Sequence, residues 1–162
     1  MLRPALLALV ATAACTAPPP PAPVAHRADF EALLGGGWTG TLTYRDYSPP
    51  HGDVTLPVAA SLTATGDGLR VAWSYPTEPH ANSADDVVLG DGGHTIDGAP
   101  VTARTVQGDT VELTTRALGQ DDDRPATIEH VYSLGPRRLA IRKSVQFGTA
   151  APIRRNEFVL TR

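Results

Sequence analysis

The chain has 162 residues, 41% of them hydrophobic and 19% charged, and is long enough for one domain with a buried core. Its 14 Lys and Arg and 17 Asp and Glu give a net charge of −3 without a basic run, so nucleic acid is not expected as a partner. A single cysteine excludes an internal disulfide and a cysteine-based metal site. No nucleophile elbow, phosphate-binding loop or His-Glu-x-x-His motif occurs, and we expect neither an enzyme nor a cofactor.

Residues 1–14 have the layout of a bacterial secretory signal peptide. Arg3 precedes an apolar run that leads into small residues, and this run is shorter than the about 20 apolar residues that span a bilayer. The residue that follows is Cys15, the only cysteine of the chain. We therefore predict that the protein is exported.

The segment Thr12-Ala13-Ala14-Cys15 resembles the lipobox of bacterial lipoproteins, with Thr12 where these motifs usually carry leucine. The resemblance implies that Cys15 is lipidated and anchors the protein in a membrane of the bacterial cell envelope. Thr16 follows Cys15 in place of the Asp that changes sorting in enteric bacteria, which favours an outer-membrane lipoprotein facing the periplasm. Cleavage without lipidation, which leaves a soluble secreted protein, is the alternative.

A proline-rich segment, Thr-Ala-Pro-Pro-Pro-Pro-Ala-Pro-Val-Ala, follows the cysteine. Proline fixes φ and lacks a backbone donor, so we expect an extended spacer that holds a domain about 25–30 Å from the lipid. The predicted organisation is a signal peptide at 1–14, the lipidated cysteine and linker at 15–27, and one domain at 28–162.

Most of this domain alternates apolar and polar residues with a period of two, as strands with one buried and one solvated face do. Turn sequences such as Gly66-Asp67-Gly68 and Gly108-Asp109 recur about every 8–12 residues. The one helical pattern, 29–34, has Asp29 as its predicted N-cap and Gly35 as its stop. These patterns predict an all-β fold, an up-and-down antiparallel barrel of about 8–10 strands with one short N-terminal helix, and a two-sheet sandwich is the alternative. The residues predicted to face the interior are Trp38, Leu42, Tyr44, Leu56, Val58, Leu62, Val71, Trp73, Val111, Leu113, Ile128, Tyr132, Ile141, Phe147 and Phe158.

The stretch from Phe30 to the sequence Gly37-Trp38-Thr39-Gly40 resembles the entry to the barrels of lipocalins and fatty-acid-binding proteins. In those barrels a Trp closes one end and an Arg from a late strand stacks on it. The resemblance implies this role for Trp38, with Arg154 or Arg155 as the stacking partner, and a small hydrophobic or amphipathic ligand. The link 48–53 between the first two strands is too short for the helical lid of fatty-acid-binding proteins.

Some polar residues share a predicted strand face with apolar ones, namely His130, Lys143 and either Arg155 with Glu157 or Arg154 with Asn156. A charge in a dry core is costly unless it is paired, so these residues need partners or water. One interpretation is an internal pair such as Lys143 with Glu157. The other is the polar end of a ligand cavity, which receives the anionic head of an amphiphile. The candidate ligand-binding residues are Tyr44, His130, Lys143, Arg154 and Arg155.

The acidic segment 119–125 is the one candidate for a calcium loop, but its carboxylates lack the spacing of an EF-hand, and a solvated turn is the preferred interpretation. The five histidines never fall at metal-ligand spacing, so no metal site is expected. Two functional classes stay open. One is a lipid-anchored envelope barrel that binds a small ligand, and the other is a structural or interaction lipoprotein whose barrel is filled by its own side chains. The oligomeric state is left open by the sequence.

Overall fold

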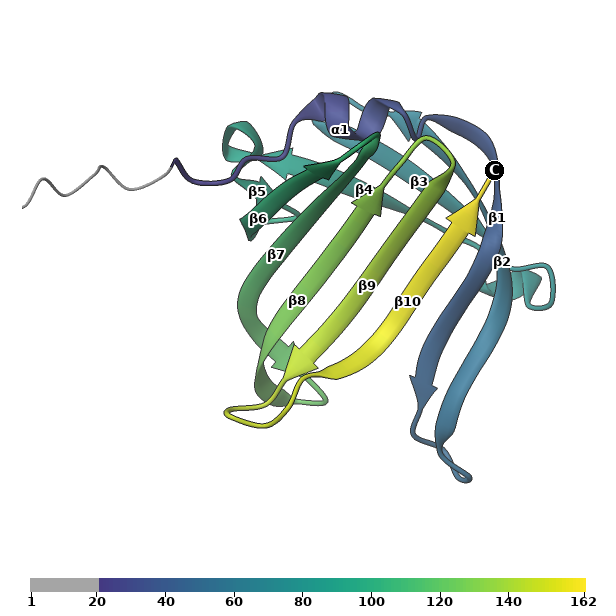
Figure 1. Ribbon diagram of the computed structural model, residues 1–162. Helices are drawn as coiled ribbons and strands as arrows, with labels where there is room; N and C mark the ends of the chain where they lie inside the picture. Colours follow the sequence, from purple (N-terminus) through teal and green to yellow (C-terminus); the bar gives the residue numbers. More distant parts are fainter. Residues whose placement is uncertain (1–20) are drawn as a thin grey trace, which may run out of the picture.

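The computed structural model describes residues 21–162, and the predicted signal peptide and Cys15 lie outside the described residues. Ten antiparallel strands close a barrel, in which each strand pairs with its sequence neighbours and the last strand pairs with the first (Figure 1). This confirms the predicted all-β, up-and-down barrel with one short helix near the N-terminus and excludes the sandwich.

The strands begin and end where the turn sequences predicted. Gly66-Asp67 and Gly108-Asp109 fall in tight connections between consecutive strands, and Gly135 begins another. Two single-turn 3₁₀ helices, η1 (Pro79–Ala81) and η2 (Asp91–Gly93), flank β4. The other elements are α1 (Arg27–Glu31), β1 (Gly35–Asp46), β2 (Gly52–Ala64), β3 (Gly68–Ser74), β4 (Ser83–Gly90), β5 (Thr95–Ile96), β6 (Ala99–Gln107), β7 (Thr110–Asp121), β8 (Arg124–Leu134), β9 (Arg138–Gln146) and β10 (Ile153–Thr161).

The helix α1 covers one end of the barrel, but its predicted cap is wrong. The N-cap is His26, and Asp29 lies in the first turn, where its carboxylate accepts the backbone N–H of His26 at 2.9 Å. The Asp29 side chain is only 4% exposed and also pairs with Arg104 of β6, with an Nη2–Oδ1 distance of 2.7 Å. An acidic side chain at this position reaches back to the free N–H before the helix, as in a capping box. The pair with Arg104 ties the helix to the barrel wall.

Trp38 closes the α1 end of the barrel, as the resemblance implied, but neither Arg154 nor Arg155 stacks on it. Its side chain is fully buried, its Nε1 donates to the Leu33 carbonyl at 2.9 Å, and the guanidinium of Arg162 lies 4.5 Å from its ring centroid. Because β10 runs toward this end, the arginine that follows its last residue reaches Trp38. Arg154 and Arg155 stand near the opposite end of the same strand.

Arg162 also joins the closing elements to one another. Its guanidinium donates to the carbonyls of Ala32 at 2.5 Å, Leu34 at 3.0 Å and Pro136 at 3.1 Å. These carbonyls belong to the segment after α1 and to the β8–β9 turn. One side chain therefore satisfies exposed backbone acceptors of two loops while its planar group covers the Trp38 ring.

The barrel closes along a seam between β1 and β10. The two strands pair from Thr39 opposite Thr161 to Tyr44 opposite Asn156. A Cβ on Gly40 would lie 2.0 Å from the Val159 carbonyl oxygen, so the close approach of the backbones requires glycine at this position. On the far side, β5 joins β4 to β6 with two residue pairs on each of its sides. In the described part of the chain no helix has the length and apolar character that a membrane crossing requires.

The core lies at the α1 end and contains most of the apolar residues that the alternation placed inside. Trp38, Val58, Leu62, Val71, Trp73, Leu113 and Tyr132 are buried there, and Leu42, Val111, Ile141 and Phe158 pack against them partly buried.

Candidate functional site

The α1 end of the barrel interior is filled by side chains. The cavity left among them has a volume of about 10 Å³, and its lining includes Phe30, Leu62 and Tyr132. A single water needs roughly 10–15 Å³, and ligand pockets measure about 300–1,000 Å³. A ligand site inside the barrel must therefore lie toward the other end, which we call the open end.

A stacked pair of aromatic rings, Trp73 and Phe158, marks the change between the two ends, with ring centroids 4.3 Å apart. On the α1 side of this pair, the inward residues Val71 and Leu160 are buried. On the other side, inward residues such as Tyr44 and His130 are only half-buried. Solvent therefore reaches part of the interior of the open end, although Val145 on the inward face of β9 is fully buried there.

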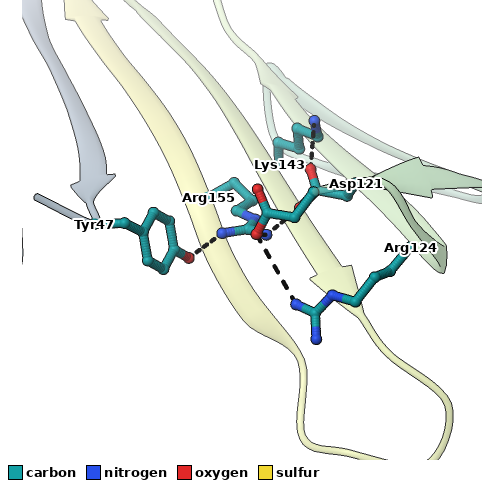
Figure 2. Close-up of polar contacts among 6 residues, drawn as sticks. Tyr47, Asp121, Arg124, Lys143 and Arg155 are labelled. Carbon is teal, nitrogen blue, oxygen red and sulfur yellow. Dashed lines mark hydrogen bonds and ion pairs between the residues drawn. The ribbon is translucent and has the colours of Figure 1, made fainter.

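The open end holds a cluster of charged side chains from three parts of the barrel (Figure 2). Arg155 donates through Nη2 to Asp121 and, at 2.6 Å, to Asp122. Lys143 pairs with the second oxygen of Asp121 at an Nζ–Oδ1 distance of 3.4 Å. The side chains of Arg155 and Asp121 are 10% and 12% exposed. One nearly buried carboxylate thus lies between two cations.

Aromatic rings surround the guanidinium of Arg155. It lies 4.8 Å from the ring centroid of Tyr47, whose hydroxyl accepts its Nη1–H, and 5.8 Å from the centroid of Phe147. Arg124 lies over Phe147 at 3.9 Å and approaches the Asp122 carboxylate, also at 3.9 Å. Figure 2 shows Tyr47 and Asp121 on opposite sides of the Arg155 guanidinium. The Nε of Arg155 is buried and has no hydrogen-bond partner among the described residues.

A β-bulge in β10 decides which residues of this strand point inward. Asn156 stands opposite Lys143 and Arg154 stands opposite Ser144, so Arg155 is an extra residue in β10. A bulge changes the alternation of side chains at the inserted residue. The alternation of the sequence predicted that either Arg155 with Glu157 or Arg154 with Asn156 points inward, and neither set is correct. Asn156 lies on the inward face, and the bulge lets Arg155 reach the inner cluster as well. Arg154 pairs instead with Asp53 at 2.5 Å and with Glu157 at 3.1 Å.

The predicted pair of Lys143 with Glu157 is wrong. Glu157 pairs with Arg154, and 27% of its side chain is exposed. Lys143 pairs instead with Asp121, the last residue of β7. The prediction assumed that Lys143 pairs with a carboxylate in its own hairpin, which β9 and β10 form. The barrel instead brings Asp121 to Lys143 across β8.

Tyr44 and His130, the other predicted site residues, are inside but less closely involved. Tyr44 stands opposite Asn156 in the seam, and among the described residues it makes no hydrogen bond to the charged cluster. His130 stands opposite Lys143 on the neighbouring strand. Burial, and secondly the charge of Lys143, lower the pKa of the His130 imidazole, while the Asp97 carboxylate opposes the change. Deeper inside, burial and Asp97 raise the pKa of Tyr132 to about 12.

The acidic segment supplies the residues that sequence reasoning missed. Asp122 and Asp123 form a tight turn in the left-handed region, with φ of 51° and 56°, which Asp tolerates better than most residues. This turn places Asp121 and Asp122 against Arg155. Within residues 21–162 no group of three or more His, Cys, Asp or Glu side chains could hold a metal ion. The run of acids was visible in the sequence, but its arginine partner, 33 residues further along, was not.

The comparisons with known proteins support the fold alone. The crystal structure of Rv2717c from M. tuberculosis is similar to this barrel, with a TM-score of 0.55 and 13% sequence identity, and the match covers 86% of this chain and 99% of that chain. No protein-family model matches the sequence. The search of curated proteins gives no match.

Proposed function

We propose that the chain is an exported, lipid-anchored barrel of the bacterial cell envelope, and that its open end binds a small amphipathic molecule with an anionic head. The binding proposal rests on the nearly buried side chain of Arg155, whose Nε has no hydrogen-bond partner among the described residues. Lys143 lies on the other side of the shared Asp121 carboxylate. A buried donor without a partner costs about 1–3 kcal/mol, which an incoming anionic oxygen would recover. The leader and lipobox of the sequence support export and anchoring.

The surroundings of the cluster suit the two parts of an amphiphile. The three cations Arg155, Lys143 and Arg124 face the two carboxylates of Asp121 and Asp122, so an anionic group can join them without meeting an excess of negative charge. The half-buried rings of Tyr44 and Phe158 offer an apolar surface toward the middle of the barrel. Because the α1 end is filled, the hydrophobic part of the ligand must be short or ring-shaped.

A binding experiment tests this proposal with two fluorescent probes, anilinonaphthalene sulfonate and a dansyl-labelled fatty acid. We expect the ring-shaped sulfonate to bind more tightly than the fatty acid. Lys143→Met should weaken the binding of anilinonaphthalene sulfonate at least tenfold, or about 1.4 kcal/mol. Arg142→Met is the matched control, because Arg142 is the adjacent residue of β9 and is exposed. Absence of binding to the wild type, or equal losses in both variants, would contradict the proposal.

The second candidate is a structural or interaction lipoprotein with a filled barrel. It is favoured by the small cavity at the α1 end and by the pairing of both inner cations with Asp121. In this case neither probe binds, and Lys143→Met changes only the free energy of unfolding. The same titrations, performed together with urea unfolding, therefore separate the two functions.

The lipid anchor is tested separately. Cells that express the full chain are grown with radioactive palmitate, and the labelled protein is compared with the Cys15→Ser variant. We expect label and membrane association in the wild type and neither in the variant. Equal labelling of both would mean that Cys15 is not the lipidated residue, and no label in either would indicate a protein that is cleaved and released.

A further inference from the structure

The lower part of the seam between β1 and β10 lacks main-chain pairing. The two strands pair only as far as Tyr44 opposite Asn156. Beyond this point β1 stays paired with β2 as far as Asp46 opposite Gly52, and β10 stays paired with β9 as far as Ile153. Figure 1 shows the β1–β2 hairpin extending away from β10 below the paired part of the seam. The hairpin, 45–53, therefore has no main-chain pairing with β10, and it has none with β3 either, because β2 pairs with β3 only from Ala59 onward.

Two side-chain contacts join this hairpin to β10. Arg154 donates through Nη2 to Asp53 at 2.5 Å, and Arg155 donates through Nη1 to the Tyr47 hydroxyl. Arg154 and Asp53 are both 40% exposed. The Arg155 side chain is 10% exposed, but its partner Tyr47 is 49% exposed, so solvent reaches both contacts. Asp53 and Arg154 have further partners in Arg45 and Glu157, at 3.7 Å and 3.1 Å.

The neighbouring strand pairs on the β10 side, β9–β10, β8–β9 and β7–β8, are closed at this end by hydrogen-bonded ladders. β7 and β8 pair without interruption down to their turn, where Asp121 stands opposite Arg124. Exposed ion pairs contribute little free energy, and local opening occurs first where few buried contacts and main-chain bonds must break. The seam is therefore expected to open before the ladders around it.

We propose that the β1–β2 hairpin is a gate of the barrel, which moves away from β10 while the other strands stay paired. The contacts of Asp53 with Arg154 and of Tyr47 with Arg155 hold it shut. Arg155 remains in place when the gate opens, because Asp121 and Asp122 hold its other nitrogen from the β7–β8 turn. Opening exposes the charged cluster from the side.

The gate is independent of any ligand, although it gains a role if the proposed binding function is correct. An amphiphile that enters between β1 and β10 meets Arg155 first and Lys143 behind it. The entrance would then lie beside the anionic head site, and the hydrophobic part would follow along Tyr44 and Phe158.

Hydrogen exchange measured by mass spectrometry tests the gate without ligand. The full chain, purified in detergent, is compared with the double variant Tyr47→Phe/Asp53→Asn, which removes the Tyr47 hydroxyl that bonds Arg155 and the Asp53 charge that pairs with Arg154. We expect amides of 39–44 and 156–161 to exchange at least tenfold faster in the variant, while those of 113–132 keep their rates. The control Asp86→Asn removes the exposed pair with Arg70 between β3 and β4, where a ladder closes the strands.

Three results would overturn the gate. The seam amides keep their wild-type rates in the double variant, or the rates rise equally throughout the barrel, or Asp86→Asn accelerates exchange in β3 and β4 as much. A further arm separates the gate from the binding function, since the double variant should bind anilinonaphthalene sulfonate with a faster association rate. If exchange rises selectively at the seam but neither protein binds the probe, the gate is supported and the proposed binding function is contradicted.

Discussion

The two ends of this barrel are built from the same strands but differ in what fills them. At the α1 end, Trp38 and Leu160 are fully buried and the remaining cavity is about 10 Å³. At the open end, the same inward faces hold Lys143 and Arg155, and solvent reaches the half-buried residues around them. The difference teaches that alternation along a strand fixes the face of a side chain, whereas its position along the strand and its neighbours there decide how far solvent reaches it.

Single strands show the change. On β9 the inward residue Leu139 is 1% exposed, and Lys143 follows four positions later with 28% of its side chain exposed, while the apolar Val145 beyond it is again buried. On β10 the order from the α1 end is Leu160, Phe158 and then the bulge with Arg155. We infer that the α1 end supplies most of the stability of the fold and that the open end is free to carry function.

The largest effect is expected where the filled end is emptied. Trp38→Ala should lower the free energy of unfolding by about 3–5 kcal/mol, because it removes a fully buried indole, its hydrogen bond and the surface under Arg162. The matched change at the open end, Tyr44→Ala, should cost less than half as much, since Tyr44 is half-buried. Urea unfolding measures both. Equal losses would remove the distinction between the ends.

The attachment of α1 gives the next effect. Asp29→Asn keeps the shape of the side chain but loses the charge-assisted bonds to Arg104, at a cost of about 2 kcal/mol. Burial acts to raise the pKa of the Asp29 carboxyl, but the bonds from Arg104 and from the His26 backbone outweigh it and hold the pKa below its usual value of 3.8. The charged form is thus favoured in the folded state, so the contribution is complete above about pH 4 and is lost as the pH falls through the lowered pKa.

Urea unfolding of the wild type and Asp29→Asn at neutral and acidic pH checks this sign. The difference between the two proteins should shrink as the pH falls below about 4. Asp86→Asn is the control, because its pair with Arg70 is half exposed and should contribute less than about 1 kcal/mol. A difference for Asp29→Asn that stays constant with pH would mean that the carboxylate charge contributes nothing.

Local patterns predicted most of this fold, and contacts between distant segments were the part that escaped. Alternation and turn residues are properties of neighbouring positions, so the strands, the hairpins and the burial of Trp38 follow from them. Arg162 was missed because its stacking depends on where β10 ends relative to Trp38. The position of Arg155 was missed because one extra residue in β10 shifts the alternation, and no composition signal marks a bulge that lacks glycine.

At the open end, removing one charge should cost much less than emptying the core. Lys143→Met should lower the free energy of unfolding by about 1 kcal/mol or less, because Asp121 keeps its stronger contact with Arg155. A loss of about 3–5 kcal/mol is the value for a buried carboxylate left without a partner. Urea unfolding distinguishes the two. The larger value would mean that Lys143, and not Arg155, is the main partner of Asp121.

The smallest effect is a pH dependence that arises inside the open end. Burial and then the Lys143 charge lower the pKa of His130 from 6.5, so its neutral form is favoured in the folded state. Below pH 6.5 the unfolded chain binds more protons at this site than the folded one, and stability therefore falls as the pH decreases toward 5.

The stability of His130→Gln should depend less on pH over this range and match the wild-type slope above about pH 7.5. His51→Gln, in the exposed β1–β2 loop, is the control. Lys143→Met should weaken the same dependence, because it removes one of its two causes. Urea unfolding at a series of pH values measures these slopes. A wild-type slope that survives His130→Gln unchanged would mean that the interior of the open end is as wet as bulk solvent around this histidine.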